Sequence, residues 1–389
     1  MESTPRIYLD YAATTPLSPA ALIAMTPWLD EFCGNPSSLY EEGRKSKAAI
    51  DAARQTVSSA LGAMFAEVIF TSGGTEAANL AIVGAALGNT DGRRRRILFG
   101  AAEHHCVLST QPILEALGYQ VQLLKVDSIG RVRMDELEYL LGPDVLLVSF
   151  IHANNEIGTL QPAMEIGRRV RAAGALFHCD AVQTFLGWQW TPEKILADLV
   201  SISAHKVGGP KGVGALYIRA GVKIKPLICG GGQEREMRPG TENVAGIVGF
   251  AAAVDSIVKA GVAPRAEKRR AARDAFIGGI DRRFFIETVS DRLDVLAGHA
   301  HLLMDGIEAE TMLILLDRMG ISASSGAACS SGSLEPSHVL LACGYPAQQA
   351  RKGLRFTFSD ATPIEDSKRA AQMLNEAAMQ IFNQRKTIV

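Results

Sequence analysis

The amino-acid sequence predicts an α/β fold built on a largely parallel sheet. Seven short runs rich in Val, Ile, Leu and Phe alternate with segments of helical periodicity between about residues 65 and 219. Such runs are typical of strands buried on both faces, and their alternation with helices is typical of α/β layers. The expected strands are 67–71, 96–100, 121–125, 145–151, 176–179, 199–204 and 214–218, with helices at 76–88 and 164–173 among the connections.

The length of the chain predicts more than one domain. It has 389 residues, and about 150 residues per domain gives two as a first expectation. The pattern changes after about residue 258, because 259–273 is rich in Lys, Arg and Ala and predicts a solvated helix that leads into a second domain. Expected strands there are 295–297, 301–304 and 355–357, and a Gly/Ser/Ala-rich loop covers 322–332.

The composition excludes several classes of protein. Hydrophobic residues make up 47% of the chain, which excludes a mainly disordered protein. The net charge of −1 provides no basic field to hold nucleic acid. No pair among the six cysteines has CxxC spacing, so no zinc or other metal site is expected. The amino terminus lacks a secretory apolar segment, and the uncharged stretch 244–254 is too short to span a bilayer. We expect a cytoplasmic enzyme.

Polar clusters follow four of the expected strands. They are 71–76, 152–156, 180–183 and 205–206. In open α/β sheets, the loops after the carboxyl ends of the strands converge on a crevice that binds ligands. We therefore expect the functional site at this edge of the sheet.

The segment Ser72-Gly73-Gly74-Thr75-Glu76 predicts a glycine-rich turn between a strand and a helix. Backbone N–H groups and the helix dipole at such a junction bind phosphate, and Thr75 adds a hydroxyl donor. The segment matches neither a Walker motif nor GxGxxG. Because similar turns are common without a ligand, this segment alone leaves both interpretations open.

Lys206 and Asp180 are a candidate pair for pyridoxal phosphate. Lys206 follows an expected strand and lies 26 residues after Asp180. A partly desolvated lysine amine can form a Schiff base with a carbonyl group, and pyridoxal phosphate needs an acidic partner for its ring nitrogen. A surface lysine and a turn aspartate are the ordinary alternatives, and Lys211 competes with Lys206. The pair favours the cofactor, although neither residue does so alone.

Two further groups are candidates for acid–base or nucleophilic chemistry. His104 and His105 follow an expected strand and could lie over a cofactor ring or move a proton, although a plain hydrogen-bonded role is as ordinary. Cys329 lies in the small-residue loop, where a thiol is more exposed than in a core, so it is a plausible nucleophile.

With these residues identified, the sequence closely resembles the NifS/IscS-type cysteine desulfurases, within the class V aminotransferase family. Ten motifs occur in the family's order. They are YLDYAATTP (8–16), GNPSS (34–38), TSGGTEAANLAI (71–82), EHHCVL (103–108), HANNEIG (152–158), HCDAVQ (178–183), SAHKVGGPKGVGALY (203–217), GGGQER (230–235), RPGTENV (238–244) and SSGAACSSGSLEPSHVL (324–340).

The resemblance implies the fold type I architecture of pyridoxal phosphate enzymes. The large domain would cover residues 16–258, with a mostly parallel seven-stranded sheet flanked by helices. A smaller α+β domain would comprise 1–15 and 259–389 and carry a mobile cysteine loop at 322–332. Two such chains would form a homodimer.

The resemblance also implies a role for each matching residue. The catalytic residues would be Cys329 as nucleophile, Lys206 as covalent anchor of pyridoxal 5′-phosphate, and His104 as ring-stacking acid–base group. The cofactor would also contact Asp180 at its ring nitrogen, Gln183 at its phenolic oxygen, and Gly74, Thr75, Ser203, His205 and the other subunit's Thr241 at its phosphate. Asn155 and Arg355 would bind the substrate.

The implied reaction converts L-cysteine to L-alanine and leaves the sulfur on Cys329 as a persulfide. The long cysteine loop favours delivery to a protein, such as an iron–sulfur scaffold. Asp360 stands where the family often has a base, and the tail after residue 383 is short, so the acceptor stays open between iron–sulfur assembly and other thiolation. The alternatives are a selenocysteine lyase, a class V aminotransferase and a catalytically silent scaffold, and the intact Lys206 and Cys329 positions argue against the last two.

Overall fold

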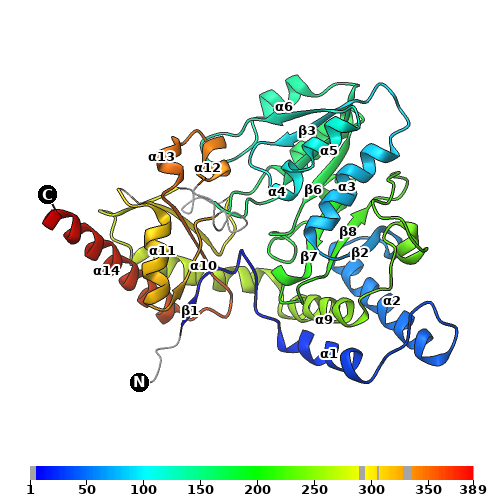
Figure 1. The fold of residues 1–389 in the computed structure, drawn as a ribbon, viewed down its shortest axis with the longest axis horizontal. Coiled ribbons are helices and arrows are strands. Elements are labelled where there is room, and N and C mark those ends of the chain that lie inside the picture. Colours follow the sequence, from blue (N-terminus) through cyan, green and yellow to red (C-terminus); the bar gives the residue numbers. More distant parts are fainter. Residues whose placement is uncertain (1–5, 289–293, 305, 327–334, 389) are drawn as a thin grey trace.

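The chain folds into two halves, each with its own sheet (Figure 1). The computed structural model describes residues 6–288, 294–304, 306–326 and 335–388. The larger half contains a seven-stranded, mostly parallel sheet with helices on both faces, and the smaller half contains a three-stranded antiparallel sheet with helices. The fold class predicted from the sequence is therefore confirmed, whereas the domain limits at 15/16 and 258/259 stay predictions.

The large sheet has the strand order β2-β8-β7-β6-β5-β3-β4. Strands β3 to β7 run parallel to one another, and β8 is antiparallel to both β2 and β7. The strands are β1 (Ile7–Tyr8), β2 (Val68–Thr71), β3 (Arg96–Gly100), β4 (Gln120–Leu124), β5 (Val145–Ile151), β6 (Leu176–Asp180), β7 (Leu199–Ser203), β8 (Gly214–Ile218), β9 (Phe285–Glu287), β10 (His299–Met304), β11 (Ile321–Ser322) and β12 (Gly353–Thr357).

The helices differ widely in length. They are α1 (Pro19–Asp30), α2 (Glu41–Leu61), α3 (Gly74–Gly88), α4 (His105–Leu108), α5 (Gln111–Ala116), α6 (Met134–Leu140), α7 (Ala163–Ala172), α8 (Pro192–Ile195), α9 (Val244–Ala260), α10 (Val262–Gly278), α11 (Ala309–Arg318), α12 (His338–Ala342), α13 (Ala347–Ala350) and α14 (Ile364–Ile388), with short 3₁₀ helices η1 (Phe65–Glu67), η2 (Ala204–Lys206) and η3 (Gln233–Glu236).

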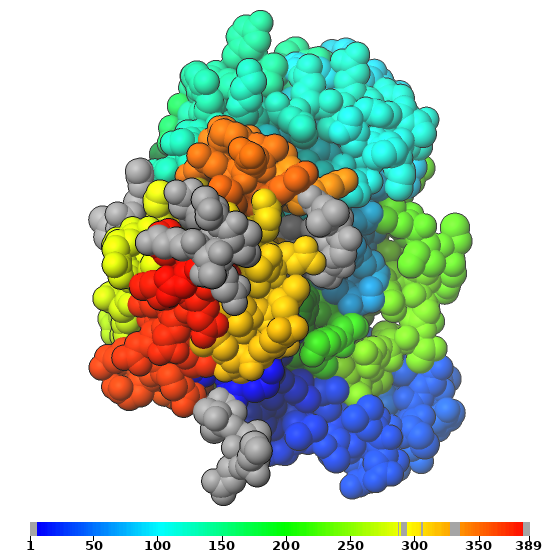
Figure 2. Space-filling view, turned by 60° about the vertical axis from the view of Figure 1, so that its left-hand side comes forward, coloured from blue at the N-terminus to red at the C-terminus, as the bar shows by residue number. Residues whose placement is uncertain are grey.

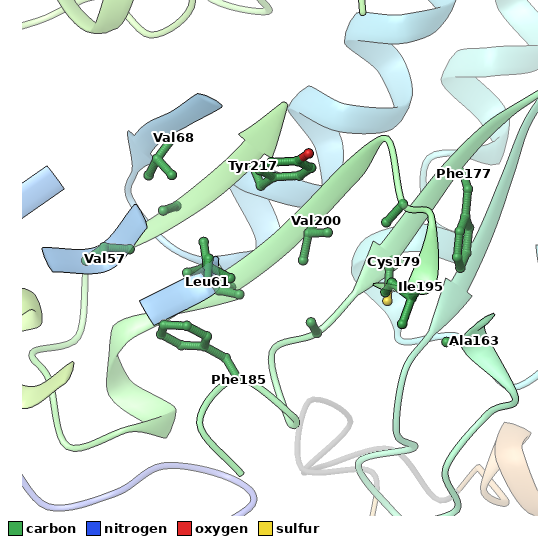
Figure 3. Packing of buried hydrophobic residues seen from close by; sticks show 14 of the residues in the cluster. Val57, Leu61, Val68, Ala163, Phe177, Cys179, Phe185, Ile195, Val200 and Tyr217 are labelled. Atoms are coloured by element: carbon green, nitrogen blue, oxygen red, sulfur yellow. The ribbon is translucent and has the colours of Figure 1, made fainter. Parts of the chain in front are cut away.

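The central strands are buried because helices cover both faces of the large sheet. Val200 and Phe177 face a cluster that includes Val57 and Leu61 of α2 (Figure 3). On the opposite face, residues of α3, α4 and α5 pack on apolar side chains of β3, β5 and β7. Alternate residues of one strand therefore enter different cores, which explains the unbroken apolar runs in the sequence.

The smaller half has a separate core formed by α10, α11, α14 and the three-stranded sheet. The change from one core to the other occurs at Gly261 (φ +82°) between α9 and α10, which bend by 84°. Among the described residues, no helix by itself has the length and apolar character needed to cross a membrane, and this bent pair meets the criteria only when its two helices are taken together.

A smaller apolar cluster joins the two halves above the functional edge of the sheet. Val339 and Leu340 of α12 pack against Ala102 and Val126 of the larger half. Figure 2 shows the segment around residues 338–350, in orange, against the cyan surface of the larger half. The cluster places α12 next to the loop that follows β3.

Some expected elements differ from the structure. Residues 295–297 do not form a strand, because the segment pairs with the large-half turn at 158–160 instead of the small sheet. The expected solvated helix at 259–273 is α10, but Ala272 and Phe276 lie in the small core. The sequence analysis did not predict β1, β9 and β11, and the bounds of β2, β4, β6, β7, β10 and β12 differ by one to two residues from the expected ones.

A buried ion pair fixes the GGGQER segment to the large sheet. Both guanidinium Nη atoms of Arg54 donate to the Glu234 carboxylate at 2.7 Å. The same carboxylate accepts the N–H of Phe70 at 2.7 Å. Glu234 adopts the left-handed conformation (φ +44°), so these bonds hold a backbone geometry that is otherwise unfavourable.

We expect Glu234→Ala to destabilise the fold by about 3–5 kcal/mol, because it leaves the buried Arg54 charge without its carboxylate. Urea unfolding followed by circular dichroism measures this change. Glu236→Ala, at an exposed position with similar φ, serves as the control and should change the free energy of unfolding by less than about 0.5 kcal/mol. Equal effects of the two substitutions would contradict the assignment of stability to the ion pair.

Candidate active site

A cavity of about 370 Å³ lies where the loops after β3, β5, β6 and β7 meet the amino terminus of α3. Ten of the twelve predicted site residues line it. They are Gly74, Thr75, His104, Asn155, Asp180, Gln183, Ser203, His205, Lys206 and Arg355. The large sheet and β12 of the smaller half together bring residues that are up to 281 positions apart in sequence to one cavity.

Lys206 is held at the floor of the cavity by the amino-terminal segment. Its Nζ donates to the carbonyl oxygens of Ala12 and, at 2.8 Å, of Ala13. The lysine ends η2, directly after β7. Lys211 does not line this cavity but lies at the neighbouring pocket around the glycine-rich turn. Of the two lysines, the structure places only Lys206 beside Asp180.

Asp180 is the last residue of β6 and is only 3% exposed. Its Oδ1 accepts the N–H of Val182 at 3.0 Å, and the Cys106 thiol donates to Oδ2 at 3.9 Å. Burial raises the pKa of Asp180 from 3.8 to about 6, although the Val182 N–H and the charge of Lys206 act against this rise. A buried carboxylate without an ion-pair partner among the described residues favours a cationic group in the cavity.

The glycine-rich turn forms an open cradle at the start of α3. Gly73 has no atom within 4 Å of the position where a Cβ would lie. A Cβ on Gly74 would lie 2.7 Å from the Val182 side chain, so this position requires glycine. Thr75, Ser203 and His205 line the same pocket. This arrangement provides hydroxyl and N–H donors at the amino terminus of a 15-residue helix, as an oxyanion requires.

His104 is a neutral imidazole with a defined tautomer. Its Nδ1 accepts the N–H of Cys106 at 3.1 Å, so the proton lies on Nε2. Burial, and then the charge of Lys206, lower the pKa of His104 from 6.5 to about 4. This geometry favours a ring that stacks and donates a hydrogen bond over one that removes a proton.

Arg355 is fixed in place by groups from three parts of the chain. It is 1% exposed, and Nη2 donates to Asp10 Oδ1 at 2.7 Å. Its Nη1 donates to the carbonyl oxygens of Asn155, at 2.9 Å, and Gly326, at 3.1 Å. Nε has no hydrogen-bond partner among the described residues. The guanidinium therefore retains a donor, and Gly326 links it to the start of the cysteine loop.

Two predicted residues are not placed in the cavity. Cys329 lies outside the described residues, although Gly326, three positions before it, lines the cavity. Thr241 is exposed and does not line this cavity or the adjoining phosphate-type pocket. Its predicted role was in the other subunit of a dimer, and that role stays a prediction.

The structure adds residues that the sequence analysis did not single out. Asp10 contacts Arg355, and the buried Glu156 carboxylate accepts the hydroxyl of Ser337 beside Gly326. His338 lines the cavity with its ring centroid 4.4 Å from that of His105. Each of these residues lies within a matched motif, so the motifs marked the segments but not the individual side chains.

The residues present fit pyridoxal phosphate. The glycine cradle matches the requirements of a phosphate, the buried Asp180 carboxylate those of a protonated ring nitrogen, and Lys206 those of an aldehyde partner. All three line one cavity at one edge of the sheet. The donor set and the burial thus agree with the cofactor that the motifs imply.

Comparisons with known proteins agree with this geometry. The sequence model of the family described as "Aminotransferase class-V" matches residues 7–369. The chain is 44% identical over 362 residues to "Cysteine desulfurase IscS" of Dictyoglomus turgidum, covering 92% of this chain and 91% of that protein. A solved structure called "NIFS-LIKE PROTEIN" has a TM-score of 0.89 and 35% identity, covering 95% of this chain and 98% of its own. Another, "SspA in complex with cysteine", has a TM-score of 0.81 and 32% identity, covering 92% and 100%.

Proposed function

Since the chain belongs to the class V aminotransferase family and is a pyridoxal phosphate-dependent cysteine desulfurase, we propose that it converts L-cysteine to L-alanine and transfers the sulfur to Cys329 as a persulfide. The observation that carries this proposal is the convergence of Lys206, Asp180 and Arg355 on one cavity. The same cavity is lined by Gly326, at the start of the segment that contains Cys329. An aminotransferase would have no use for a nucleophilic cysteine in this motif.

The bound cofactor supplies an electron sink for the pair released when a bond at the substrate α-carbon breaks. Asp180 would hold the proton on the ring nitrogen, and Gln183 and His104, which line the same cavity, would help to orient the ring. The cradle at Gly74 binds the phosphate. Lys206 would hold the cofactor through its amine, and the same amine would be the group that accepts and returns the substrate α-proton.

The sulfur transfer balances without an added oxidant. The Cys329 thiolate attacks the substrate sulfur, and the S–S bond forms as the carbon–sulfur bond of the substrate breaks. The electron pair of that bond stays on the substrate carbon, which takes up a proton and becomes the methyl group of alanine. The transfer requires a thiol that can reach both the substrate sulfur and, afterwards, an acceptor, because the same sulfur must be passed on.

The most direct test measures products from L-cysteine with cofactor-loaded protein and a reductant. Alanine and sulfide in equal amounts would support the proposal. The absence of both products would contradict it. L-selenocysteine, tested in parallel, separates the alternative lyase, which would turn over that substrate far faster than L-cysteine.

We expect Arg355→Lys to raise the KM for L-cysteine by about 10- to 100-fold, because lysine keeps the charge beside Asp10 but loses bidentate binding of the carboxylate. Steady-state kinetics and thermal unfolding should be measured together. A lower unfolding temperature with unchanged KM would instead assign Arg355 a structural role. Arg351→Lys, at an exposed position nearby, is the control.

We expect the affinity of the apoprotein for pyridoxal phosphate to fall as the pH drops below about 6. The pKa of Asp180 is raised to about 6 by burial, so the carboxyl is ionised above that pH and protonated below it. Protonation removes its attraction for the ring nitrogen, which lowers the affinity by up to about tenfold per pH unit. The phosphate of the cofactor titrates in the same range. The contribution of Asp180 is therefore the difference between the pH profile of cofactor affinity of the parent protein and that of Asp180→Asn. Identical pH profiles would contradict this role.

Assembly and destination are proposals that rest on the resemblance described above. We propose a homodimer in which Thr241 of one subunit reaches the cradle of the other. We also propose a cytoplasmic location and a sulfur-acceptor protein, such as an iron–sulfur scaffold. Cross-linking through a cysteine introduced at position 241, which is exposed in this chain, would test the subunit contact.

A further inference from the structure

A second buried carboxyl group lies close to Asp180. Glu103 follows β3, is 1% exposed and immediately precedes His104. Gly100 leaves room for it, since a Cβ there would lie 3.3 Å from Glu103 Oε1. The mechanism above gives this side chain no role.

The two carboxyl groups have different partners. Glu103 Oε1 accepts the backbone N–H of Ile151, and Oε2 lies 3.3 Å from Ser149 Oγ. Both of these partners are neutral, whereas Asp180 experiences the positive charge of Lys206. When two buried acids repel each other, the one with the better counter-charge ionises and the other keeps its proton.

A buried hydrogen-bond chain can accommodate the proton of Glu103. Ser149 Oγ lies 2.8 Å from His178 Nδ1, and His178 Nε2 lies 2.7 Å from Ser201 Oγ. Burial lowers the pKa of His178 to about 3, so the ring is neutral and carries one proton. A protonated Glu103 donates to Ser149, Ser149 donates to His178 Nδ1, and Nε2–H donates to Ser201. The hydrogens that Glu103, Ser149 and His178 contribute to this chain then each have an acceptor.

We propose that Glu103 is a positioning residue of the active site, a buried carboxylic acid that keeps its proton so that Asp180 alone carries the negative charge facing the ring nitrogen. A second ionised carboxyl would repel the charge of Asp180 and hold it protonated at neutral pH. This inference rests on the proposed function of Asp180 as the partner of the cofactor.

The surroundings of Glu103 agree with a neutral acid. Burial, followed by the charge of Asp180, raises the pKa of Glu103 well above its ordinary value. On β6, the buried thiol of Cys179 has its pKa raised, first by burial, and so is also uncharged. On α12, His338 Nε2 lies 2.9 Å from the Glu103 carbonyl oxygen. That bond involves the backbone of Glu103, whereas its carboxyl group contacts Ser149 and Ile151 of β5.

Infrared spectroscopy of the cofactor-loaded protein tests the protonation state. At pH 8, the protein should show a carboxylic-acid carbonyl band that disappears in Glu103→Gln and persists in Glu115→Gln, an exposed control. In Asp180→Asn, the pH at which this band titrates should fall by at least one unit, because the repelling charge is gone. The absence of the band, or its persistence in Glu103→Gln, would overturn the proposal.

The second measurement is the pH dependence of cofactor affinity. Glu103→Gln replaces one neutral group with another. The midpoint near pH 6 of the pH dependence of cofactor affinity should therefore stay within about 0.3 units of that of the parent protein. A midpoint lowered by more than one unit would mean that Glu103 is ionised, and would overturn the proposal. If Glu103→Gln does not fold, the band in Asp180→Asn decides alone. If Asp180→Asn binds the cofactor as tightly as the parent at every pH, the proposed function of Asp180 fails, whatever the infrared result.

Discussion

Cys329→Ala should lose desulfuration by about 10³-fold or more while it still binds the cofactor. The thiolate is the only group in the proposed reaction that forms a bond to the substrate sulfur, and alanine offers no replacement. Lys206 and the phosphate cradle belong to other segments, so their binding of the cofactor should not change. Alanine and sulfide production, together with the absorbance of the bound cofactor, measure the two effects separately.

The control for this variant is a second cysteine. Cys229 is exposed and lies outside the cavity, so Cys229→Ala should retain the activity of the parent protein. Labelling the protein with a persulfide-reactive reagent after exposure to L-cysteine should mark the parent and Cys229→Ala but not Cys329→Ala. Unchanged turnover in Cys329→Ala would refute the assignment of the nucleophile.

Lys206→Ala should lower turnover by a similar factor and abolish covalent attachment of the cofactor. The lysine amine serves twice, as the anchor and as the group that moves the α-proton, and each function depends on its place beside Ala12 and Ala13. After reduction with borohydride and denaturation, the cofactor should remain on the parent chain and be lost from the variant. Mass spectrometry of the digested chain identifies the attachment site.

Lys211→Ala is the matched control, because Lys211 is the competitor that spacing alone could not exclude. It lies at the phosphate-type pocket and not in the main cavity. We expect this variant to keep covalent attachment and to bind the cofactor more weakly, through loss of a charge near the phosphate. Attachment that survives in Lys206→Ala and disappears in Lys211→Ala would reverse the assignment.

The large sheet could be predicted from the sequence because each strand is a local signal. The expected bounds of β3, β5 and β8 match the structure, since consecutive apolar residues mark strands covered on both faces. Local signals failed for 295–297, where the apolar run packs on a turn of the larger half. The choice between a sheet and a turn depends on distant partners, which a local pattern does not contain.

The candidate site was predictable to the extent that motifs name residue types. The motifs located Lys206 and Asp180, but not the contact between Asp10 and Arg355, which are 345 positions apart. They also did not separate Glu103 from its neighbours. Its burial depends on the absence of a side chain at Gly100 and on the N–H of Ile151 in another strand, so its chemistry is a property of the packed structure.

The pairing of the first strand with the last ones affects the order in which the protein can mature during synthesis. Ile7 pairs with Ile321, Leu9 contacts Thr357, and Asp10 contacts Arg355. The ribosome therefore synthesises the segment with Ala12 and Ala13, which holds Lys206, early. It synthesises the residues that pair with this amino-terminal segment, in β11 and β12, late. A nascent chain that lacks β12 lacks the hydrogen bonds of Leu9 and Ala12 to Thr357, which help to hold the segment whose carbonyl groups accept from the lysine amine. Loading with cofactor should accordingly follow release of the chain, and prematurely terminated chains should not compete for the cofactor.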